Sequence, residues 1–329
     1  MSSTRPRILL LSAYDAASHK RWREQLIMSL PEFDWHCLTL PPRFFRWRIR
    51  GNALSWLNEP ALQEPWDLII ATSMTDLVGL RGFHQTLTSV PTLLYMHENQ
   101  FAFPESSHAT NNVEPCMINL FSAVAADHLV FNSEWNRQSF LQGVSALFKK
   151  LPDQLPKGLP EALLNKSSIL PVPLEDKLFI KRQCLTDTTC PHLLWNHRWE
   201  YDKGPDRLLK LLDSLVSRGQ DFRLSLVGEQ FRQQPEAFAQ IQQVHHSRLL
   251  HFGYQTQIEE YHQLLQQADI VLSTALHDFQ GLSMLEAMPL AALRWHPIDW
   301  PIRSTSLLSS VTPATPKTRM PRLTPPPNV

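Results

Sequence analysis

Two charged segments in the second half of the chain contain residues suited to binding a sugar diphosphate. Residues 197–205 read His-Arg-Trp-Glu-Tyr-Asp-Lys-Gly-Pro, which places Arg198 and Lys203 between an apolar run and a helical pattern. Arginine grips phosphate oxygens with a planar fork and lysine adds a compact charge, so the pair could offset the charge on a departing nucleoside diphosphate. The alternative interpretation is a solvated turn with unrelated charges.

The second segment, residues 277–287, reads His-Asp-Phe-Gln-Gly-Leu-Ser-Met-Leu-Glu-Ala and holds two carboxylates around a glycine. Gly281 would let the backbone approach a ligand, and the amides that open the following helix favour an anion. Asp278 could accept hydrogen bonds from sugar hydroxyls, and Glu286 could hold a ribose. The alternative is an acidic helix start stabilised by the helix dipole. The spacing alone is weak evidence, but together with Arg198 and Lys203 it indicates a nucleotide-sugar site.

Polar residues also follow two apolar runs in the first half of the chain. His97, Glu98 and Asn99 follow one run, and Ser18 and His19 lie in the loop after the first run. We interpret His97 as a site residue, with a purely structural histidine as the alternative. Small residues before His19 would admit a phosphate or an acceptor, whereas the absence of Gly-x-Gly-x-x-Gly excludes the nicotinamide fingerprint.

A third cluster interleaves cations with aromatic residues. It contains Arg43, Arg46, Trp47, Arg48 and Arg50, and residues 1–50 hold nine Lys and Arg against four Asp and Glu. Phosphate contacts by the cations and stacking on the aromatic rings would suit RNA. The alternative is a solvated amphipathic turn whose aromatic side chains belong to the core.

The hydrophobic pattern predicts an α/β scaffold for these residues, with two tandem doubly wound parallel sheets. Apolar runs that end in polar or small residues predict strands at 7–12, 36–40, 68–71, 92–96 and 128–131. A second series predicts strands at 192–196, 222–227, 249–252 and 270–273, with helices at 20–30, 205–218 and 257–267. Ligands of such sheets bind beyond the carboxyl ends of strands, where Gly228 also falls.

The bulk properties fit this scaffold. A chain of 329 residues with 43% hydrophobic residues is long enough for two domains with real cores. A formal net charge of zero argues against a wholly basic nucleic-acid-coating protein but allows a local basic patch. The four cysteines show no disulfide or zinc spacing, and the apolar run at 8–11 is too short for a signal peptide or a membrane span. We therefore expect a cytoplasmic protein without a membrane partner.

Proline usage suggests where the domains end. Prolines at 152, 156, 160, 171 and 173 mark a loop-rich passage, so we predict a first domain at 1–172 and a second at 173–288. Residues 289–329 contain nine of the 26 prolines and no glycine. We expect this tail to be disordered or loosely packed and to add no further well-formed strand or helix.

Together the motifs resemble retaining glycosyltransferases of the GT-B fold, and more closely the tRNA-queuosine α-mannosyltransferase family. The resemblance covers about residues 7–288 and rests on segments 18–20, 43–50, 95–100, 130–133, 151–153, 197–203, 227–229, 251–254, 268–269 and 273–287. It implies transfer of mannose from GDP-mannose to the cyclopentene diol of queuosine in the anticodon of tRNA-Asp. It also implies retention of configuration and no need for a metal or other cofactor.

The resemblance also implies residue roles. His97 and Asp278 would be catalytic. Arg198 and Lys203 would bind the diphosphate and Glu286 the ribose, and the remaining donor contacts would come from Gly228, Glu229 and Gly281. Contacts to the tRNA acceptor would come from Ser18, His19, Arg43, Arg46, Trp47, Arg48, Arg50, Glu98 and Asn99. The chain departs from the pattern at Asp278, where many GT-B enzymes have Glu, and at positions 16–17, where two alanines replace a Gly-Gly of some relatives.

A larger departure begins after Met288, where the family-like sequence stops and the second domain is expected to be truncated. Residues 289–300 can be back-translated so that another reading frame gives Ala-Gly-Cys-Val-Ala-Leu-Ala-Pro-Asp-Arg-Leu-Ala, a family-like continuation. We hypothesise a frameshift near codon 289. A resequenced gene that reads through the proline-rich tail in a single frame would contradict this hypothesis.

Two other functions stay open. One is a GT-B transferase with another nucleotide-sugar donor and a lipid or polysaccharide acceptor, which would need an amphipathic docking face in the first domain. The other is a catalytically dead relative that binds tRNA or a nucleotide, against which the intact Arg198, Lys203, Asp278 and Glu286 argue.

Overall fold

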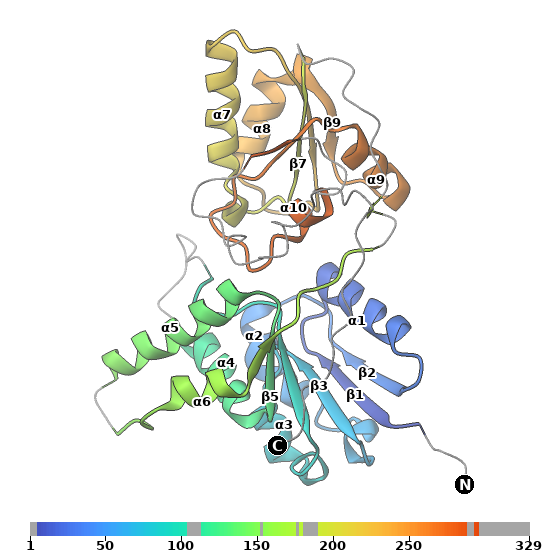
Figure 1. The fold of residues 1–329 in the computed structure, drawn as a ribbon, viewed down its shortest axis with the longest axis vertical. Helices are drawn as coiled ribbons and strands as arrows, with labels where there is room; N and C mark the ends of the chain where they lie inside the picture. Colours follow the sequence, from blue (N-terminus) through green and yellow to red (C-terminus); the bar gives the residue numbers. More distant parts are fainter. Residues whose placement is uncertain are drawn as a thin grey trace, which may run out of the picture.

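The protein consists of two lobes, each built on a parallel sheet with helices on its faces (Figure 1). The structure, a computed structural model, describes residues 5–103, 113–151, 154–175, 178–179, 190–287 and 293–295. Residues 7–169 supply the first sheet and residues 192–295 the second. The predicted α/β class with two tandem sheets is therefore confirmed.

The first sheet has the strand order β2-β1-β3-β4-β5-β6 and is parallel throughout. Its strands are β1 (Arg7–Ser12), β2 (Asp34–Thr39), β3 (Leu68–Thr72), β4 (Thr92–Met96), β5 (His128–Phe131) and β6 (Ser167–Ile169). The helices that cross over between them are α1 (Ala17–Ser29), α2 (Phe45–Ser55), α3 (Leu77–Phe83), α4 (Glu114–Ala125), α5 (Glu134–Lys150) and α6 (Leu159–Asn165).

The inner strands β1, β3, β4 and β5 bury both faces, which explains their nearly continuous apolar sequences, whereas the edge strands β2 and β6 are less buried and more polar. Side chains of a strand alternate between the two faces. Leu9 and Leu11 of β1 accordingly enter one hydrophobic cluster, whereas Ile8 and Leu10 enter another on the opposite face. Because helices cover both clusters, the loops at the carboxyl ends of the strands remain the exposed edge for polar side chains.

The second sheet has the order β11-β10-β7-β8-β9 and is also parallel. Its strands are β7 (His192–Asn196), β8 (Arg223–Val227), β9 (Leu249–Gly253), β10 (Ile270–Leu272) and β11 (Leu293–Trp295). Its helices are α7 (Pro205–Ser217), α8 (Glu236–Val244), α9 (Ile258–Gln267) and α10 (Leu282–Ala287). Trp195, Trp199 and Phe238 are wholly buried between the sheet, α7 and α8, where the rings of Trp199 and Phe238 stack at 4.3 Å.

Two short strands were not predicted. The polar strand β6 lacks an apolar run, and it is recruited by pairing with β5. Residues 289–329 include the three-residue strand Leu293–Trp295, which pairs with β10, and the expectation that this tail supplies no well-formed strand and helix stays a prediction. The rest of that segment lies outside the described residues. The predicted boundary between residues 172 and 173 stays a prediction, and it falls in the connection between the two sheets.

Within the described ranges, no helix combines the length and the apolar character needed to cross a membrane.

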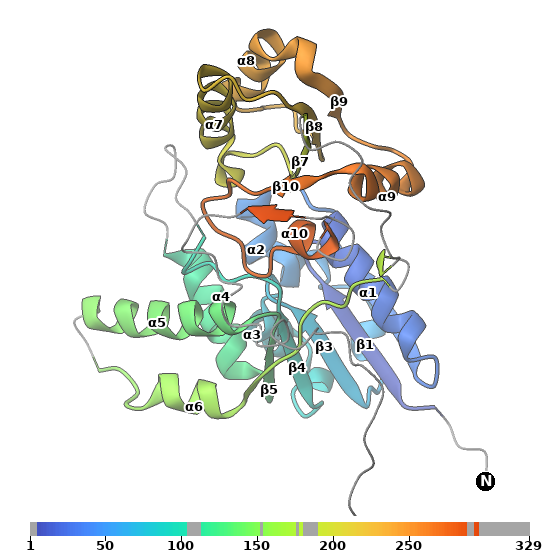
Figure 2. The same cartoon turned by 45° about the horizontal axis from the view of Figure 1, so that its top comes forward.

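The loops after β1 and β4 meet those after β7 and β8 between the lobes. Tyr14 of the first lobe lies close enough to Glu200, Arg198 and Glu229 of the second lobe for their charges to act on its pKa. The carboxyl-terminal edges of the two sheets thus share one interdomain region (Figure 2).

Candidate functional site

The two charged segments of the second lobe follow neighbouring strands and come into direct contact. Arg198 and Lys203 lie between β7 and α7, and Asp278 lies between β10 and α10. The Lys203 ammonium nitrogen is 2.8 Å from Asp278 Oδ1 and 3.0 Å from Asp202 Oδ2. Residues some 75 positions apart in sequence therefore form one ion-paired group.

This ion-paired group keeps its charges at neutral pH. Burial works to lower the pKa of Lys203, but the carboxylates of Asp278 and Asp202 outweigh it, so that the pKa is raised. Burial works to raise the pKa of Asp278, but the Lys203 ammonium outweighs it and the pKa is lowered. An ammonium has three N–H donors, of which one bonds to Asp278 Oδ1, whereas Asp202 Oδ2 is an ion-pair partner without a hydrogen bond. The remaining donors can meet a phosphate oxygen.

Arg198 is more open to solvent than Lys203. Its side chain is 45% exposed, and its guanidinium contacts Glu200 at 2.7 Å. Because a guanidinium carries five N–H donors in a fork, this contact leaves donors for phosphate. The two predicted phosphate ligands thus differ, since one is buried and fixed and the other is accessible.

Glycines let the second-lobe loops pack tightly around this group. Gly228 follows β8 with φ +151°, and a Cβ atom there would lie 1.8 Å from the carbonyl oxygen of His197. Any side chain at this position would push apart the loops that follow β7 and β8. Gly281 has φ +73°, a left-handed conformation that glycine adopts without strain, and it precedes α10. Glu229 is exposed beside Gly228.

Glu286 lies on α10 with its side chain only 8% exposed. Its carboxylate contacts Arg21 of the first lobe at 2.5 Å and accepts a hydrogen bond from the Tyr261 hydroxyl at 2.8 Å. Neither partner was predicted, because neither belongs to a motif or follows a strand directly.

On the first lobe, His97 and His19 form the centre of an aromatic cluster. Their ring centroids are 4.2 Å apart, and the rings of Trp22 and Tyr95 lie 4.7 and 4.6 Å from His97. Burial lowers the pKa of both histidines, so both are neutral at pH 7. Among the described residues, both His19 ring nitrogens and Nε2 of His97 are buried without a hydrogen-bond partner. Each such atom calls for an explanation, and a hydroxyl group of a ligand would supply a partner here.

The other predicted acceptor residues of this region divide into two groups. Ser18 is exposed at the start of α1, and Glu98 is half-buried, with its charge acting on Tyr14 and His19. Asn99 is wholly buried, and its side-chain amide bonds to Asn136 and to the backbone of Phe101. The contact of Asn99 with the acceptor stays a prediction, which this arrangement does not favour because its polar atoms hold the loop after β4 on α5.

The cluster of cations and aromatic residues begins α2 and is partly accessible. Phe44, Phe45 and Trp47 are 72%, 37% and 54% exposed, so the alternative that these rings belong to the core is wrong. Phe44 adopts a left-handed backbone with φ +54°, which is strained for an aromatic residue. Arg43 and Arg46 are also exposed. The Tyr14 and Phe45 rings lie 6.1 Å apart in an edge contact, so this patch adjoins the interdomain region.

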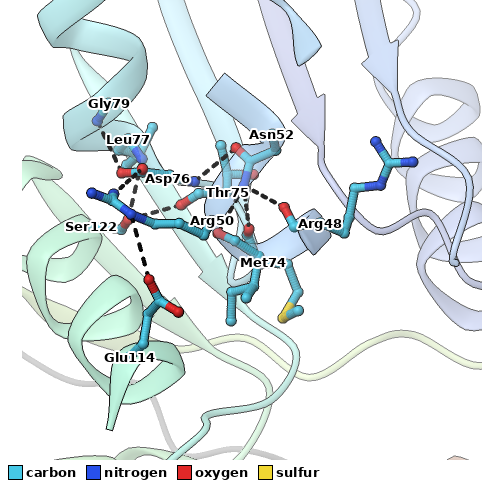
Figure 3. Close-up of polar contacts among 11 residues, drawn as sticks. Arg48, Arg50, Asn52, Met74, Thr75, Asp76, Leu77, Gly79, Glu114 and Ser122 are labelled. Atoms are coloured by element: carbon cyan, nitrogen blue, oxygen red, sulfur yellow. Dashed lines mark hydrogen bonds and ion pairs between the residues drawn. The ribbon is translucent and has the colours of Figure 1, made fainter. Parts of the chain in front are cut away.

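Of the predicted cations, Arg50 is ion-paired within the protein, whereas Arg48 has a buried Nε without a hydrogen-bond partner among the described residues (Figure 3). Arg48 is buried, and its guanidinium points away from the polar network beside it. Its contact with the acceptor stays a prediction, which the low accessibility of the side chain does not favour. Arg50 donates to Asp76 at 2.9 Å and lies 3.7 Å from Glu114. Asp76 also accepts the Gly79 backbone N–H that opens α3, so Arg50 joins α2 to α3 and α4.

No group of three or more His, Cys, Asp or Glu side chains is arranged to hold a metal ion in the part of the chain that the structure describes. The site instead presents cations for phosphate and carboxylates for hydroxyl groups. The expectation that no metal or cofactor is needed stays a prediction.

Comparison with known sequences agrees with this arrangement. The family model for the N-terminal region of tRNA-queuosine alpha-mannosyltransferases matches residues 7–174, and that for glycosyl transferases group 1 matches residues 176–291. A tRNA-queuosine alpha-mannosyltransferase from Drosophila melanogaster is 34% identical over 295 residues. The aligned part covers 87% of this chain and 78% of that relative.

Solved structures share the architecture. A UDP-forming α,α-trehalose-phosphate synthase from Burkholderia xenovorans superimposes with a TM-score of 0.57 at 13% identity, covering 88% of this chain and 82% of that one. The lipopolysaccharide outer core galactosyltransferase WaaB gives a TM-score of 0.56 at 13% identity, covering 86% and 78% of the two chains. At such identities the likeness shows the fold alone, and that fold is GT-B.

Proposed function

Because the chain belongs to the tRNA-queuosine α-mannosyltransferase family and is a glycosyltransferase, we propose that it transfers mannose from GDP-mannose to queuosine in the anticodon of tRNA-Asp, with retention of configuration. The observation that carries this proposal is the contact between Lys203 and Asp278. It joins a cation suited to phosphate and a carboxylate suited to sugar hydroxyls, in the loops that follow β7 and β10, and the charge of Arg198 in the same loops acts on His19 of the first lobe.

The second lobe would bind the donor. Arg198 and Lys203 would hold the diphosphate and stabilise the charge that develops on GDP as its bond to the sugar breaks. Asp278 would accept hydrogen bonds from mannose hydroxyls, and Glu286 would do so from the ribose. Gly281 and the pair Gly228 and Glu229 would line the loops that enclose the nucleotide. No metal enters this scheme, because the two cations would supply the positive charge.

The first lobe would present the acceptor. His97 and His19 are neutral and have unpaired ring nitrogens, so they could bond to hydroxyl groups of the transferred sugar or of the queuosine diol. The exposed Arg43, Arg46 and Trp47 would contact the tRNA through phosphate pairing and base stacking. Ser18 and Glu98 would lie between these two regions.

Incubation of the protein with labelled GDP-mannose and queuosine-containing tRNA tests the proposal. We expect label in the tRNA with the wild-type protein and none with Lys203→Ala, which should still bind tRNA. Lys210→Ala provides the matched control, because Lys210 is exposed on α7. Unchanged transfer by a folded Lys203→Ala protein would refute the role of Lys203.

The same assay separates the remaining functions. Transfer of label to a lipid or polysaccharide in place of tRNA would favour another acceptor. Binding of GDP and tRNA without any transfer would favour a catalytically dead relative.

A further inference from the structure

Glu286 is held by two partners from different parts of the molecule. Arg21 Nη1 lies 2.5 Å from Oε1, and the Tyr261 hydroxyl donates to Oε2 at 2.8 Å. The Glu286 carboxylate is nearly buried. Burial of a carboxylate is unfavourable unless partners satisfy its charge, and such partners also fix its orientation. With one partner on each oxygen, its orientation is fixed.

The Arg21 partner comes from the first lobe, on α1. The next residue, Trp22, belongs to a hydrophobic cluster of the first lobe on which Leu282 of α10 packs. The loop before α10 is bonded to the same lobe, because the Gln280 side chain exchanges two hydrogen bonds of 2.9 Å with the backbone of Val172. The helix α10, which carries Glu286, therefore packs against the first lobe as well as against its own sheet.

The Tyr261 partner comes from the second lobe, on α9, and its hydroxyl has a fixed direction. Asn196 Nδ2 donates to the Tyr261 oxygen at 3.0 Å and to the Ser283 carbonyl oxygen at 3.0 Å. The tyrosine oxygen accepts from Asn196, so its proton is directed to Glu286. Burial and the Glu286 carboxylate raise the pKa of Tyr261 well above its usual value, which keeps that proton in place.

Two atoms of this network have no hydrogen-bond partner within the described ranges. They are Nη2 of Arg21 and Oδ1 of Asn196, and both are buried. Each Glu286 oxygen also keeps a second lone pair, because each accepts from one protein group. The network is thus incomplete as a protein structure and offers hydrogen-bonding positions around a fixed carboxylate, as expected of a site that a ligand fills.

We propose that Arg21 and Tyr261 are positioning residues that orient Glu286 toward the 2′- and 3′-hydroxyls of the donor ribose. The first lobe then completes the nucleotide site of the second. This inference rests on the proposed function, in which Glu286 binds the ribose. A purely structural role for Arg21 and Tyr261 would affect the binding of any nucleotide, whereas the proposed role affects only the binding of ligands that have the 2′- and 3′-hydroxyls.

A cycle of variants and ligands tests the inference on the full chain. The dissociation constants of GDP and of 2′,3′-dideoxy-GDP are measured by calorimetry for wild type, Arg21→Gln, Arg21→Lys and Tyr261→Phe. We expect Arg21→Gln to weaken GDP binding about tenfold and Tyr261→Phe about threefold, as befits hydrogen bonds to a charged group. Arg21→Lys should restore part of the loss. None of the variants should change the affinity for dideoxy-GDP by more than about twofold, because that ligand lacks the hydroxyls.

Kinetics give an independent readout. Arg21→Gln should raise the KM for GDP-mannose more than it lowers kcat, because the ribose does not react. Lys20→Gln is the matched control, since Lys20 precedes Arg21 on α1, is 59% exposed and should leave every constant unchanged. Equal losses for GDP and dideoxy-GDP, or unchanged GDP binding in both Arg21→Gln and Tyr261→Phe, would overturn the inference.

The outcome for wild type separates this inference from the proposed function. A wild-type protein that binds UDP in place of GDP would refute the proposed donor, and the same cycle would then be run with UDP and its dideoxy analogue. A wild-type protein that binds neither nucleotide would refute both proposals. Tyr261→Phe removes a single oxygen atom, so it keeps the test decisive if Arg21→Gln fails to fold.

Discussion

The two sides of the interdomain site differ in whether ion pairs hold their buried polar groups. On the second lobe, Lys203 is enclosed by the carboxylates of Asp202 and Asp278. On the first lobe, His19 is buried and His97 half-buried, both are neutral, and ring nitrogens of both are buried without partners among the described residues, while the cations nearby are exposed. The donor side therefore has a charged group held by ion pairs before any ligand arrives, whereas buried atoms on both sides, Asp278 Oδ2 and the His277 ring nitrogens included, lack a hydrogen-bond partner among the described residues.

The largest expected effect follows from removing the ion pair between Lys203 and Asp278 on the second lobe. Asp278→Asn keeps the shape of the side chain but removes the charge that fixes Lys203. We expect initial rates of mannosyl transfer to fall about a hundredfold, the scale on which a preorganised electrostatic contact contributes. Asp206→Asn, in the exposed first turn of α7, serves as the control. A rate within twofold of wild type would show that the ion-paired group does not act in the reaction.

The neutral histidines predict a loss of stability in mild acid. Burial lowers the pKa of His197 from 6.5 to about 4 and that of His277 to about 4, and burial lowers those of His19 and His97 as well. At pH values between the histidine pKa of the folded state and that of the unfolded state, the unfolded state binds more protons. The free energy of unfolding is therefore highest above about pH 6.5 and decreases as the pH falls. For His197 alone the loss at pH 5 is about 2 kcal/mol.

Urea unfolding at pH 7.5 and pH 5 measures this loss. The ion pair of Lys203 and Asp278 stays charged over that range, because the pKa of Asp278 is lowered and that of Lys203 is raised. The histidines should therefore dominate the change among the groups of the site, and His197→Gln should reduce it. Equal midpoints at the two pH values would contradict the neutral state of these histidines.

A smaller effect is expected at the exposed aromatic residues. The Trp47 ring lies close above Gly51, where a Cβ atom would come within 2.5 Å of the ring, so the ring rests on the helix with one face open. If a tRNA base stacks there, Trp47→Ala should weaken tRNA binding about tenfold without changing the KM for GDP-mannose. Phe121→Ala, which removes an exposed ring from α4, is the control. Equal tRNA affinity in a filter-binding assay would exclude stacking on Trp47.

The smallest effects separate two arginines of one helix. Arg46 is exposed, whereas Arg50 is paired with the buried carboxylate of Asp76. The logarithm of the tRNA affinity falls linearly with the logarithm of the salt concentration, and Arg46→Ala should reduce the slope of that line by about one. Arg50→Ala should leave that slope unchanged and lower the unfolding free energy by about 1 kcal/mol or less, since its side chain is half exposed. The reverse result would show that Arg50 is the phosphate ligand.

The strands were predictable because burial on both faces makes them continuous apolar runs. The bounds of β1, β4, β5 and β7 agree with the sequence prediction, whereas the short strands β6 and β11 were missed. Pairing with a neighbour, rather than their own composition, makes these segments strands. A property that arises from tertiary pairing leaves little signal in a local pattern.

The site residues show the same division. Lys203 and Asp278 could be assigned to one site from the sequence because each follows a strand of a parallel sheet, but their ion pair was not predicted. Asn99 and Arg48 carry suitable side chains, but packing against other elements buries them. Arg21 and Tyr261 were missed because only the seating of α10 on the first lobe brings them to Glu286. Side-chain chemistry can thus be predicted locally, but accessibility cannot.

Nucleoside analysis of the acceptor tests the central claim most directly. The protein is incubated with GDP-mannose and tRNA-Asp that contains queuosine, and the digested tRNA is analysed by mass spectrometry. The account predicts a queuosine nucleoside that has gained one hexose, and no change in the same tRNA with guanosine in place of queuosine. Unmodified queuosine after incubation with a folded protein that binds both GDP and the tRNA would contradict it.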